Sequence, residues 1–229
     1  MCGRFAQYQG QADYLRELNT GQDVISGYDN VPIGRYNVAP GSRVQVLHNA
    51  ADGLRIDPCH WGWVPFWAKG PRPAPINARV ETVTTGKFFK AFWPQGRALV
   101  MADGWYEWVS DPHDPKRKQP YFIRLKSQAP MFMAALAQVR AGLAPNEGDG
   151  FVIITAASDA GMVDIHDRRP LALGPVDARA WIDLEVPAEE AERLARERCL
   201  PVEAFEWFAV GEAVGNVHDE GAQLVVMQP

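Results

Sequence analysis

The chain has 229 residues, of which 47% are hydrophobic and 22% charged, and its formal net charge is −5. This length and composition predict a single domain, residues 1–229, built around one hydrophobic core. No apolar run is long enough to span a membrane, and Arg4 close behind Met1 argues against a secretory signal. Three widely spaced cysteines (Cys2, Cys59 and Cys199) argue against a disulfide framework, so we expect a cytosolic protein.

Short apolar and alternating segments predict a chain built mostly of strands. The spacing of Tyr14, Leu15 and Leu18 predicts a short helix over residues 11–19. Strands are expected where β-branched, aromatic and other apolar residues gather, at 43–48, 97–101, 121–125, 131–136 and 151–155. The Asp, Pro, Lys and Arg residues of 111–119 predict an exposed hairpin loop. The clearest helix is 187–199, with a proline near its start, acidic residues in its first turn and arginines towards its end.

These strands and helices do not alternate regularly, which bears on the fold class. A regular strand–helix–strand alternation would indicate a parallel sheet, and this chain lacks it. The pattern predicts an α+β fold, with a mostly antiparallel sheet curled towards a barrel and peripheral helices.

The second residue carries the most specific chemical signal. A Met followed by a small side chain is the usual substrate for removal of the initiator Met, so the mature chain would begin at Cys2. Its α-amine and thiol would then sit on adjacent carbons, where the amine adds to an aldehyde and the thiol closes a thiazolidine ring. Unperturbed pKa values of about 8 and about 8.5 leave part of each group nucleophilic at neutral pH. The alternative is that Cys2 has no special role.

Two segments place polar residues where a scaffold does not need them. In INARVET (76–82) the side chains of Asn77, Arg79 and Glu81 share one face of an extended backbone. The alternative is a half-buried strand with a salt bridge. In ADGWYEW (102–108) Glu107 stands among aromatic residues, which favours a raised pKa and proton transfer. The alternative is an edge-strand carboxylate facing water.

Two further segments combine basic side chains with other functional groups. DIHDRRP (164–170) presents His166 beside Asp167, Arg168 and Arg169, which suits proton exchange and phosphate binding, or else a salt-bridged loop. WGWVPFWAKGPRP (61–73) interleaves Trp61, Trp63, Phe66 and Trp67 with Lys69 and Arg72. Such a pattern suits base stacking in single-stranded nucleic acid, although tryptophans more often lie in the core.

The charge of the chain is uneven. Residues 1–130 carry 16 basic and 11 acidic side chains, whereas residues 131–229 carry 7 and 17. Because phosphate binding depends on the local field, a basic face built from the first part is compatible with the negative total. A mixed, solvated surface is the alternative.

Eight segments in order resemble one known family. They are MCGRF at the start, GRYNVAP (34–40), WGWVP (61–65), INARVET, ADGWYEW, TAASD (155–159), DIHDRRP and AVGNV (213–217). Together they are similar to the SRAP family, the SOS-response-associated peptidases, over residues 2 to about 217. The resemblance implies a compact α+β domain with a barrel-like sheet core and a positively charged DNA groove.

The resemblance also implies a mechanism. Members of this family capture the ring-opened aldehyde of an abasic site in single-stranded DNA as a thiazolidine crosslink, which protects the site during replication-linked repair. Cys2 matches the capturing residue and Asn77 the residue that orients it. Glu107 matches the carboxyl group that moves protons during ring opening and imine formation. His166 matches the histidine that acts as a general acid and base at the sugar oxygen and in reversal of the crosslink.

For DNA binding, the resemblance assigns phosphate contacts to Arg4, Arg79 and Arg168 and base contacts to Trp67 and Trp108. Close relatives often have two adjacent tryptophans where this chain has Trp67 and Ala68, so one base contact is expected to be lost. No cofactor or metal is implied. The protein is expected to act as a monomer, with abasic single strands as its partner and replication-fork proteins as further candidates.

The resemblance implies self-removal of Met1 as the peptidase activity, and a minor lyase activity through the imine. Two other functions fit parts of the sequence. An N-terminal-nucleophile amidohydrolase would use the Cys2 thiol alone, and a non-catalytic strand binder would tolerate Cys2→Ala. A metal site at Cys59 and His60 lacks a second ligand pair at suitable spacing.

Overall fold

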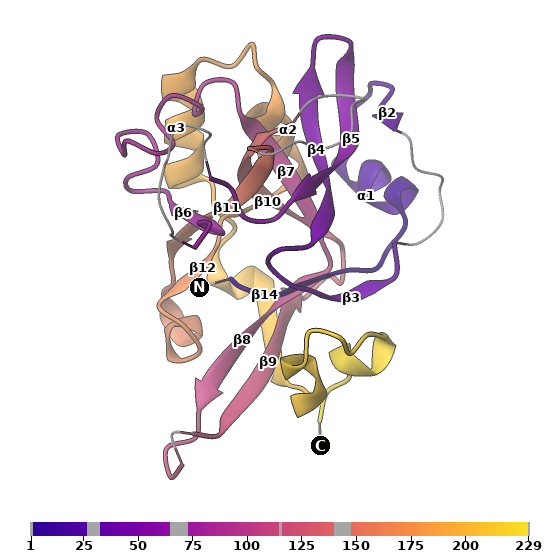
Figure 1. The fold of residues 1–229 in the computed structure, drawn as a ribbon, viewed down its shortest axis with the longest axis vertical. Coiled ribbons are helices and arrows are strands. Elements are labelled where there is room, and N and C mark those ends of the chain that lie inside the picture. Colours follow the sequence, from indigo (N-terminus) through magenta and orange to yellow (C-terminus); the bar gives the residue numbers. More distant parts are fainter. Residues whose placement is uncertain (1, 27–32, 65–72, 115, 140–147, 229) are drawn as a thin grey trace.

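Two β-sheets form the body of the molecule in the computed structural model, which describes residues 2–26, 33–64, 73–114, 116–139 and 148–228 (Figure 1). The small sheet has the order β14 (Phe205–Ala209), β9 (Lys118–Leu125), β8 (Gly104–Ser110), β1 (Phe5–Gln7) and β3 (Arg35–Val38). The large sheet has the order β12 (Arg168–Pro170), β11 (Gly150–Ala157), β10 (Met131–Gln138), β7 (Arg97–Ala102), β4 (Arg43–Ala50), β5 (Gly53–His60) and β2 (Ile25–Ser26).

Two short strands complete the large sheet beside that path. β13 (Ala172–Leu173) pairs with β10, and β6 (Asn77–Arg79) pairs in parallel with β11. β2 and β5 are also parallel, as is an isolated bridge between Trp61 and Phe151, and the other pairings described are antiparallel. The predicted α+β class with a mostly antiparallel sheet is therefore confirmed. Within the described residues both sheets end in outer strands, so neither is a closed barrel.

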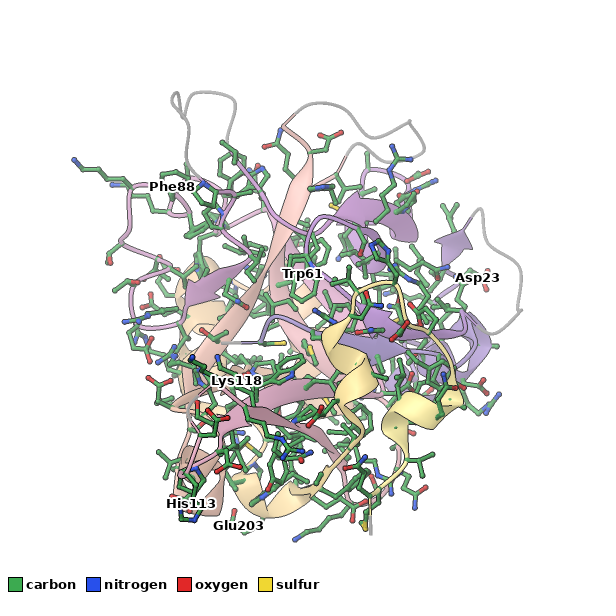
Figure 2. The ribbon with its side chains drawn as sticks, turned by 60° about the horizontal axis from the view of Figure 1, so that its bottom comes forward. Asp23, Trp61, Phe88, His113, Lys118 and Glu203 are labelled. Carbon is green, nitrogen blue, oxygen red and sulfur yellow. The ribbon has the colours of Figure 1, made fainter. Side chains whose placement is uncertain are left out.

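The described α-helices are α1 (Gln11–Leu18), α2 (Pro175–Ile182) and α3 (Ala188–Glu197). Short 3-10 helices are η1 (Ala160–Asp164), η2 (Val202–Ala204), η3 (Glu212–Gly215) and η4 (Ala222–Val225). The two helices predicted from periodicity correspond to α1 and α3, and the five predicted strands all fall within observed ones. None of the described helices combines the length and apolarity needed to cross a membrane. The predicted loop at 111–119 is confirmed for the described residues between β8 and β9, which include His113 (Figure 2), whereas Lys118 and Gln119 already belong to β9.

The large sheet is buried on both faces, which explains its continuous apolar strands. Along β10, Phe132 and Ala134 face a core shared with the three helices, here called the helix-side core. The alternate residues Met131 and Met133 face a second core that includes Cys2 and residues of the small sheet, here called the inter-sheet core. The molecule thus stacks helices, large sheet and small sheet, and the start of the chain enters between the two sheets.

A buried carboxylate ties the start of the chain to the large sheet. Asp103 accepts hydrogen bonds from the backbone N–H groups of Tyr8 and Gln9, at 2.6 and 3.2 Å. It also accepts from the Gln9 side chain at 2.7 Å and from the Tyr14 hydroxyl at 2.7 Å. Burial raises the pKa of Asp103 in spite of these donors. The carboxylate therefore joins β1 and α1 to the connection between β7 and β8.

We predict that Asp103→Ala lowers the free energy of unfolding by about 3 kcal/mol, because several buried donors lose their acceptor together. Urea unfolding at neutral pH measures the change. Tyr14→Phe, which removes one of these bonds, should cost about 1 kcal/mol. An Asp103→Ala protein as stable as the wild type would show that this cluster does not stabilise the fold.

Candidate active site

The pairing of β1 with β8 determines where Cys2 lies. Phe5 stands opposite Trp105 in an antiparallel register, and the Tyr106 N–H donates to the Arg4 carbonyl at 2.9 Å. Chain residues before Phe5 therefore run along β8 towards Glu107. Cys2 ends up in the inter-sheet core with its side chain 0% exposed. In Figure 1 this indigo end of the chain lies beside β12, at the junction of the two sheets.

Asn77 holds this leading residue from the other sheet. Its side-chain nitrogen donates to the Cys2 carbonyl at 3.0 Å. Asn77 is the first residue of β6, and the Trp61 indole supports that strand by donating to the Ile76 carbonyl at 3.0 Å. The Asn77 side-chain oxygen is buried and accepts no hydrogen bond within the described structure. The amide thus retains an unused acceptor beside Cys2.

Glu107 is a buried acid next to the thiol. Its side chain is 4% exposed on β8, which lies between β1 and β9, so the interpretation as an edge-strand carboxylate facing water is wrong. Burial raises the pKa of Glu107 to about 7, which confirms the raised value expected from its aromatic neighbours.

The thiol responds to the same environment. Burial, and then the negative charge of Glu107, raise the pKa of the Cys2 thiol far above its usual range. In the chain that retains Met1 the thiol is therefore neutral. The partly ionised thiol is expected for the chain without Met1, and for that form it stays a prediction.

His166 follows η1 and approaches the site through the loop before β12. The backbone N–H of Arg168 donates to its Nδ1 at 2.9 Å, which requires an unprotonated Nδ1. The Asp167 carboxylate lies 2.8 Å from the same atom, which would require a protonated one. Burial lowers the pKa of His166, and the Asp167 side chain is largely exposed, so we favour the neutral ring with its proton on Nε2.

Arg4 contacts the Trp108 ring, and its guanidinium also forms hydrogen bonds within the protein. The guanidinium lies 5.6 Å from the Trp108 ring centroid. One nitrogen donates to the Asn37 side chain and to the Val214 carbonyl, both at 2.7 Å. Asn37 in turn donates to the carbonyls of Asn216 and Asp219 at 2.9 and 2.8 Å. Segments 34–40 and 213–217 thus anchor the end of the chain over the small sheet.

Arg79 and Arg168 lie on strands that flank β11. Arg79 pairs with Thr155 in the register of β6, and Arg168 pairs with Ala157 in the register of β12. Arg79 is exposed, and its guanidinium makes no hydrogen bond or ion pair within the residues that the structure describes. Arg168 instead forms a two-pronged pair with Glu81, at 2.7 and 3.0 Å. The salt bridge considered for segment 76–82 therefore exists, with a partner far along the chain.

The tryptophans of segment 61–73 do not form an exposed stacking platform where they are described. Trp61 and Trp63 are both buried, and Trp61 stacks against Phe151 with 6.2 Å between ring centroids. Trp61 is labelled near the middle of the view in Figure 2. For these two residues the base-stacking interpretation is wrong, because their rings fill the core. Phe66, Trp67, Lys69 and Arg72 lie outside the described residues.

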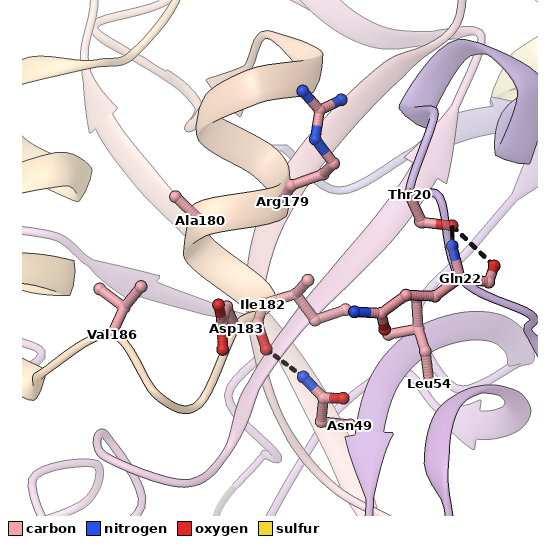
Figure 3. Close-up of a pocket in the computed structure, with 9 residues that line it drawn as sticks. All are labelled: Thr20, Gln22, Asn49, Leu54, Arg179, Ala180, Ile182, Asp183 and Val186. Carbon is pink, nitrogen blue, oxygen red and sulfur yellow. Dashed lines mark hydrogen bonds between the residues drawn. The ribbon is translucent and has the colours of Figure 1, made fainter.

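A separate cavity of about 340 Å³ opens between α2, the β4–β5 pair and the chain after α1 (Figure 3). Its wall includes Asn49, Leu54, Arg179 and Asp183, and Asn49 crosses it to donate to the Ile182 carbonyl. None of the predicted catalytic residues lines it. The candidate site is therefore the junction around Cys2, which joins residues from both sheets, and not this cavity.

The pKa of Glu107 leads to a prediction about stability. Because the folded-state pKa is raised above the usual value, the unfolded chain ionises first as pH rises. The free energy of unfolding should therefore fall by about 3 kcal/mol between about pH 5 and about pH 8 through this group. In Glu107→Gln this contribution should be missing when urea unfolding is measured across the range. Glu203→Gln, which removes an exposed carboxylate, serves as the control and should follow the wild-type profile. A wild-type profile in Glu107→Gln would rule out the raised pKa.

This chain is similar to known proteins over most of its length. The sequence profile of the SOS response associated peptidase (SRAP) family matches residues 1–217. The abasic site processing protein YedK of Escherichia coli is 46% identical over 229 residues, covering 98% of this chain and 99% of that protein. The abasic site processing protein YoaM of Bacillus subtilis is 30% identical and covers 98% and 97%.

A solved structure has the same fold. The crystal structure of a phage-related protein from Bordetella bronchiseptica matches with a TM-score of 0.80 and 37% identity, covering 96% of this chain and 99% of that one. The profile match extends from the Cys2 end through segment 213–217, and so includes every part of the junction described above. The chain belongs to the SRAP family.

Proposed function

We propose that this protein processes abasic sites in single-stranded DNA by forming a covalent bond between Cys2 and the damaged sugar. The observation that carries the proposal is the hydrogen bond from Asn77 to the Cys2 carbonyl, which holds the leading residue beside the buried acid Glu107. Two relatives, YedK and YoaM, are abasic site processing proteins, which supports the choice of substrate.

The reaction begins with an abasic sugar that opens from a hemiacetal to an aldehyde. The Cys2 amine, freed by removal of Met1, adds to the aldehyde carbon, and loss of one water molecule gives an imine. The thiol then adds to the same carbon while its proton passes to the nitrogen, which completes a five-membered thiazolidine. Because the sulfur proton moves to nitrogen within the ring closure, a neutral thiol is a competent reactant.

Two neighbouring groups are suited to proton transfer in this sequence. Glu107, with a pKa of about 7, is protonated in part of the population at neutral pH and supplies a proton to the departing oxygen. His166, neutral with its proton on Nε2, exchanges protons at the sugar oxygen during ring opening and during reversal. The unused Asn77 oxygen accepts from the amine and orients it.

The buried position of Cys2 adds a requirement to the proposal. The thiol has no exposed surface in the chain that carries Met1, so cleavage of that residue must open a path for the sugar. Self-removal of Met1 is the peptidase activity that we assign to the protein. An imine that does not close to the thiazolidine permits β-elimination at the sugar, which would give a minor strand-cleaving activity.

DNA contacts are assigned to the basic and aromatic residues around the junction. Arg79 is exposed and unpaired within the described structure, and suits a direct phosphate contact. Arg168 can bind a phosphate after Glu81 leaves it, and the stacked pair of Arg4 and Trp108 offers an aromatic surface for a base. Trp67 keeps its assigned base contact as a prediction.

The amidohydrolase alternative is less well supported by the site. It relies on the thiol alone as the nucleophile, yet burial and the charge of Glu107 both disfavour the thiolate in the chain that carries Met1. Turnover of small amides by the processed protein, without reaction at abasic DNA, would favour this alternative.

The crosslink is tested directly. The processed protein, mixed with a single strand that contains one abasic site, should give a protein–DNA species that survives denaturation on a gel. Cys2→Ala should abolish the stable species, because an imine without sulfur remains open to hydrolysis. A Cys2→Ala protein that still binds and still gives the stable product would exclude the thiazolidine.

The free terminus provides the matched control. A chain with one residue inserted before Cys2 keeps every other side chain but lacks the aminothiol, and it should fail like Cys2→Ala. Intact mass identifies which form is present in each sample. Cys199→Ala, which removes a cysteine outside the junction, should crosslink as the wild type does.

The role of Arg79 in DNA binding is tested by measuring the affinity for DNA at several salt concentrations. Arg79→Ala should weaken binding to an unmodified single strand and lower the slope of log K against log salt by about 0.7, the value for one phosphate contact. Fluorescence anisotropy over a salt series measures both. Arg193→Ala, which removes an exposed arginine of α3 that pairs with Glu190, should leave the slope unchanged. Equal slopes for Arg79→Ala and the wild type would remove Arg79 from the interface.

A further inference from the structure

Glu81 binds the guanidinium of Arg168, which is the group of the candidate DNA surface best arranged to hold an anion. Its two carboxylate oxygens accept from two nitrogens of Arg168, at 2.7 and 3.0 Å. The hydrogen bond from Arg168, with the charges of Arg168 and Arg79, lowers the pKa of Glu81. An ionised carboxylate therefore lies close to both arginines that are assigned to phosphates.

The planar guanidinium of Arg168, here called the Arg168 fork, points two N–H donors at an anion and is held in a fixed position. A guanidinium that binds two oxygens side by side is the arrangement that proteins use for phosphate as well as for carboxylate. One of its nitrogens also donates to the Thr155 carbonyl at 2.6 Å, and its backbone N–H donates to His166. The group is thus anchored to β11 and lies two residues from a predicted catalytic side chain.

The two partners differ in their freedom to move. The Arg168 side chain is 11% exposed, whereas Glu81 is 44% exposed. Glu81 lies just beyond the end of β6, in a turn segment, so its carboxylate can swing into solvent while the fork stays where it is. When a phosphate replaces the Glu81 carboxylate, the Arg168 guanidinium keeps an anionic partner. Leaving this largely buried charge without a partner would cost free energy.

We propose that Glu81 is an internal phosphate mimic, which fills the Arg168 fork in the DNA-free protein and is displaced by a backbone phosphate of the bound strand. The inference rests on the proposed function, because it names the DNA contact at the same site. Its consequence is that Glu81 competes with DNA and weakens the binding of any strand. The competing interpretation is a purely structural pair that fastens β6 to β12, and it predicts the opposite effect of removing the charge.

The test is Glu81→Gln, which keeps the size of the side chain and one possible hydrogen bond but removes the charge. Binding to an unmodified single strand is measured by anisotropy over a salt series. The variant should bind about fivefold tighter near 0.15 M salt, because a pair of this kind is worth about 1 kcal/mol. The slope of log K against log salt should become steeper by about 0.7, because in the variant no displaced carboxylate offsets the charge with which Arg168 neutralises the phosphate.

A matched control separates this effect from general electrostatics. Glu192 pairs with Arg196 at 2.8 Å, and Arg196 also reaches the Glu81 carbonyl, so Glu192 lies in the same region without contacting Arg168. Glu192→Gln removes the same charge and should leave the salt slope unchanged. In an Arg168→Gln background, Glu81→Gln should give no gain in affinity, because there is no fork to release.

The outcomes are distinct. Unchanged or weaker binding by Glu81→Gln, or the same gain in Glu192→Gln, would overturn the inference. So would a gain that persists in the Arg168→Gln background. The proposed function is judged on a separate result, namely whether the wild-type protein crosslinks an abasic strand. If Glu81→Gln binds single strands more tightly but the wild-type protein never crosslinks an abasic strand, the phosphate-mimic inference is supported and the proposed function is excluded.

Discussion

The antiparallel pairing of β1 with β8 is the constraint on which the candidate site depends. It carries the start of the chain into the layer between the two sheets, where Asn77 from β6 meets the Cys2 carbonyl. A leading residue is ordinarily the least ordered part of a chain. Here backbone pairing on one side and a side-chain amide on the other give it a defined position, which a reaction between two adjacent groups and one carbonyl carbon requires.

Burial favours the neutral form of all three ionisable groups of the junction. It raises the pKa of Cys2 and of Glu107 and lowers that of the partly buried His166, because each charged form loses hydration. The junction therefore favours a neutral thiol, a partly protonated carboxyl and a neutral imidazole. Such groups are suited to passing protons among themselves during imine formation, where charge appears and disappears on nitrogen and oxygen.

Several features of the site could be read from local sequence. The aromatic neighbours of Glu107 indicated a low-polarity environment, and its raised pKa confirms that interpretation. The alternation in segment 76–82 indicated a strand with Asn77 and Arg79 on it, and β6 contains both. The strand is shorter than the pattern suggested, because the chain turns before Glu81, which then reaches Arg168. That pairing spans 87 residues, and nothing local to either segment indicates it.

The sequence by itself determined the fold class, five of the longer strands and two of the helices, and it predicted which groups react. These follow from periodicity, turn residues and side-chain chemistry, which act over a few neighbouring residues. Only the tertiary structure decided that Cys2 is buried, that Trp61 and Trp63 fill the core, and that Arg4 and Arg168 are already held by partners. Those properties depend on which strands pair across the sheets, and pairing brings together residues that are far apart in the chain.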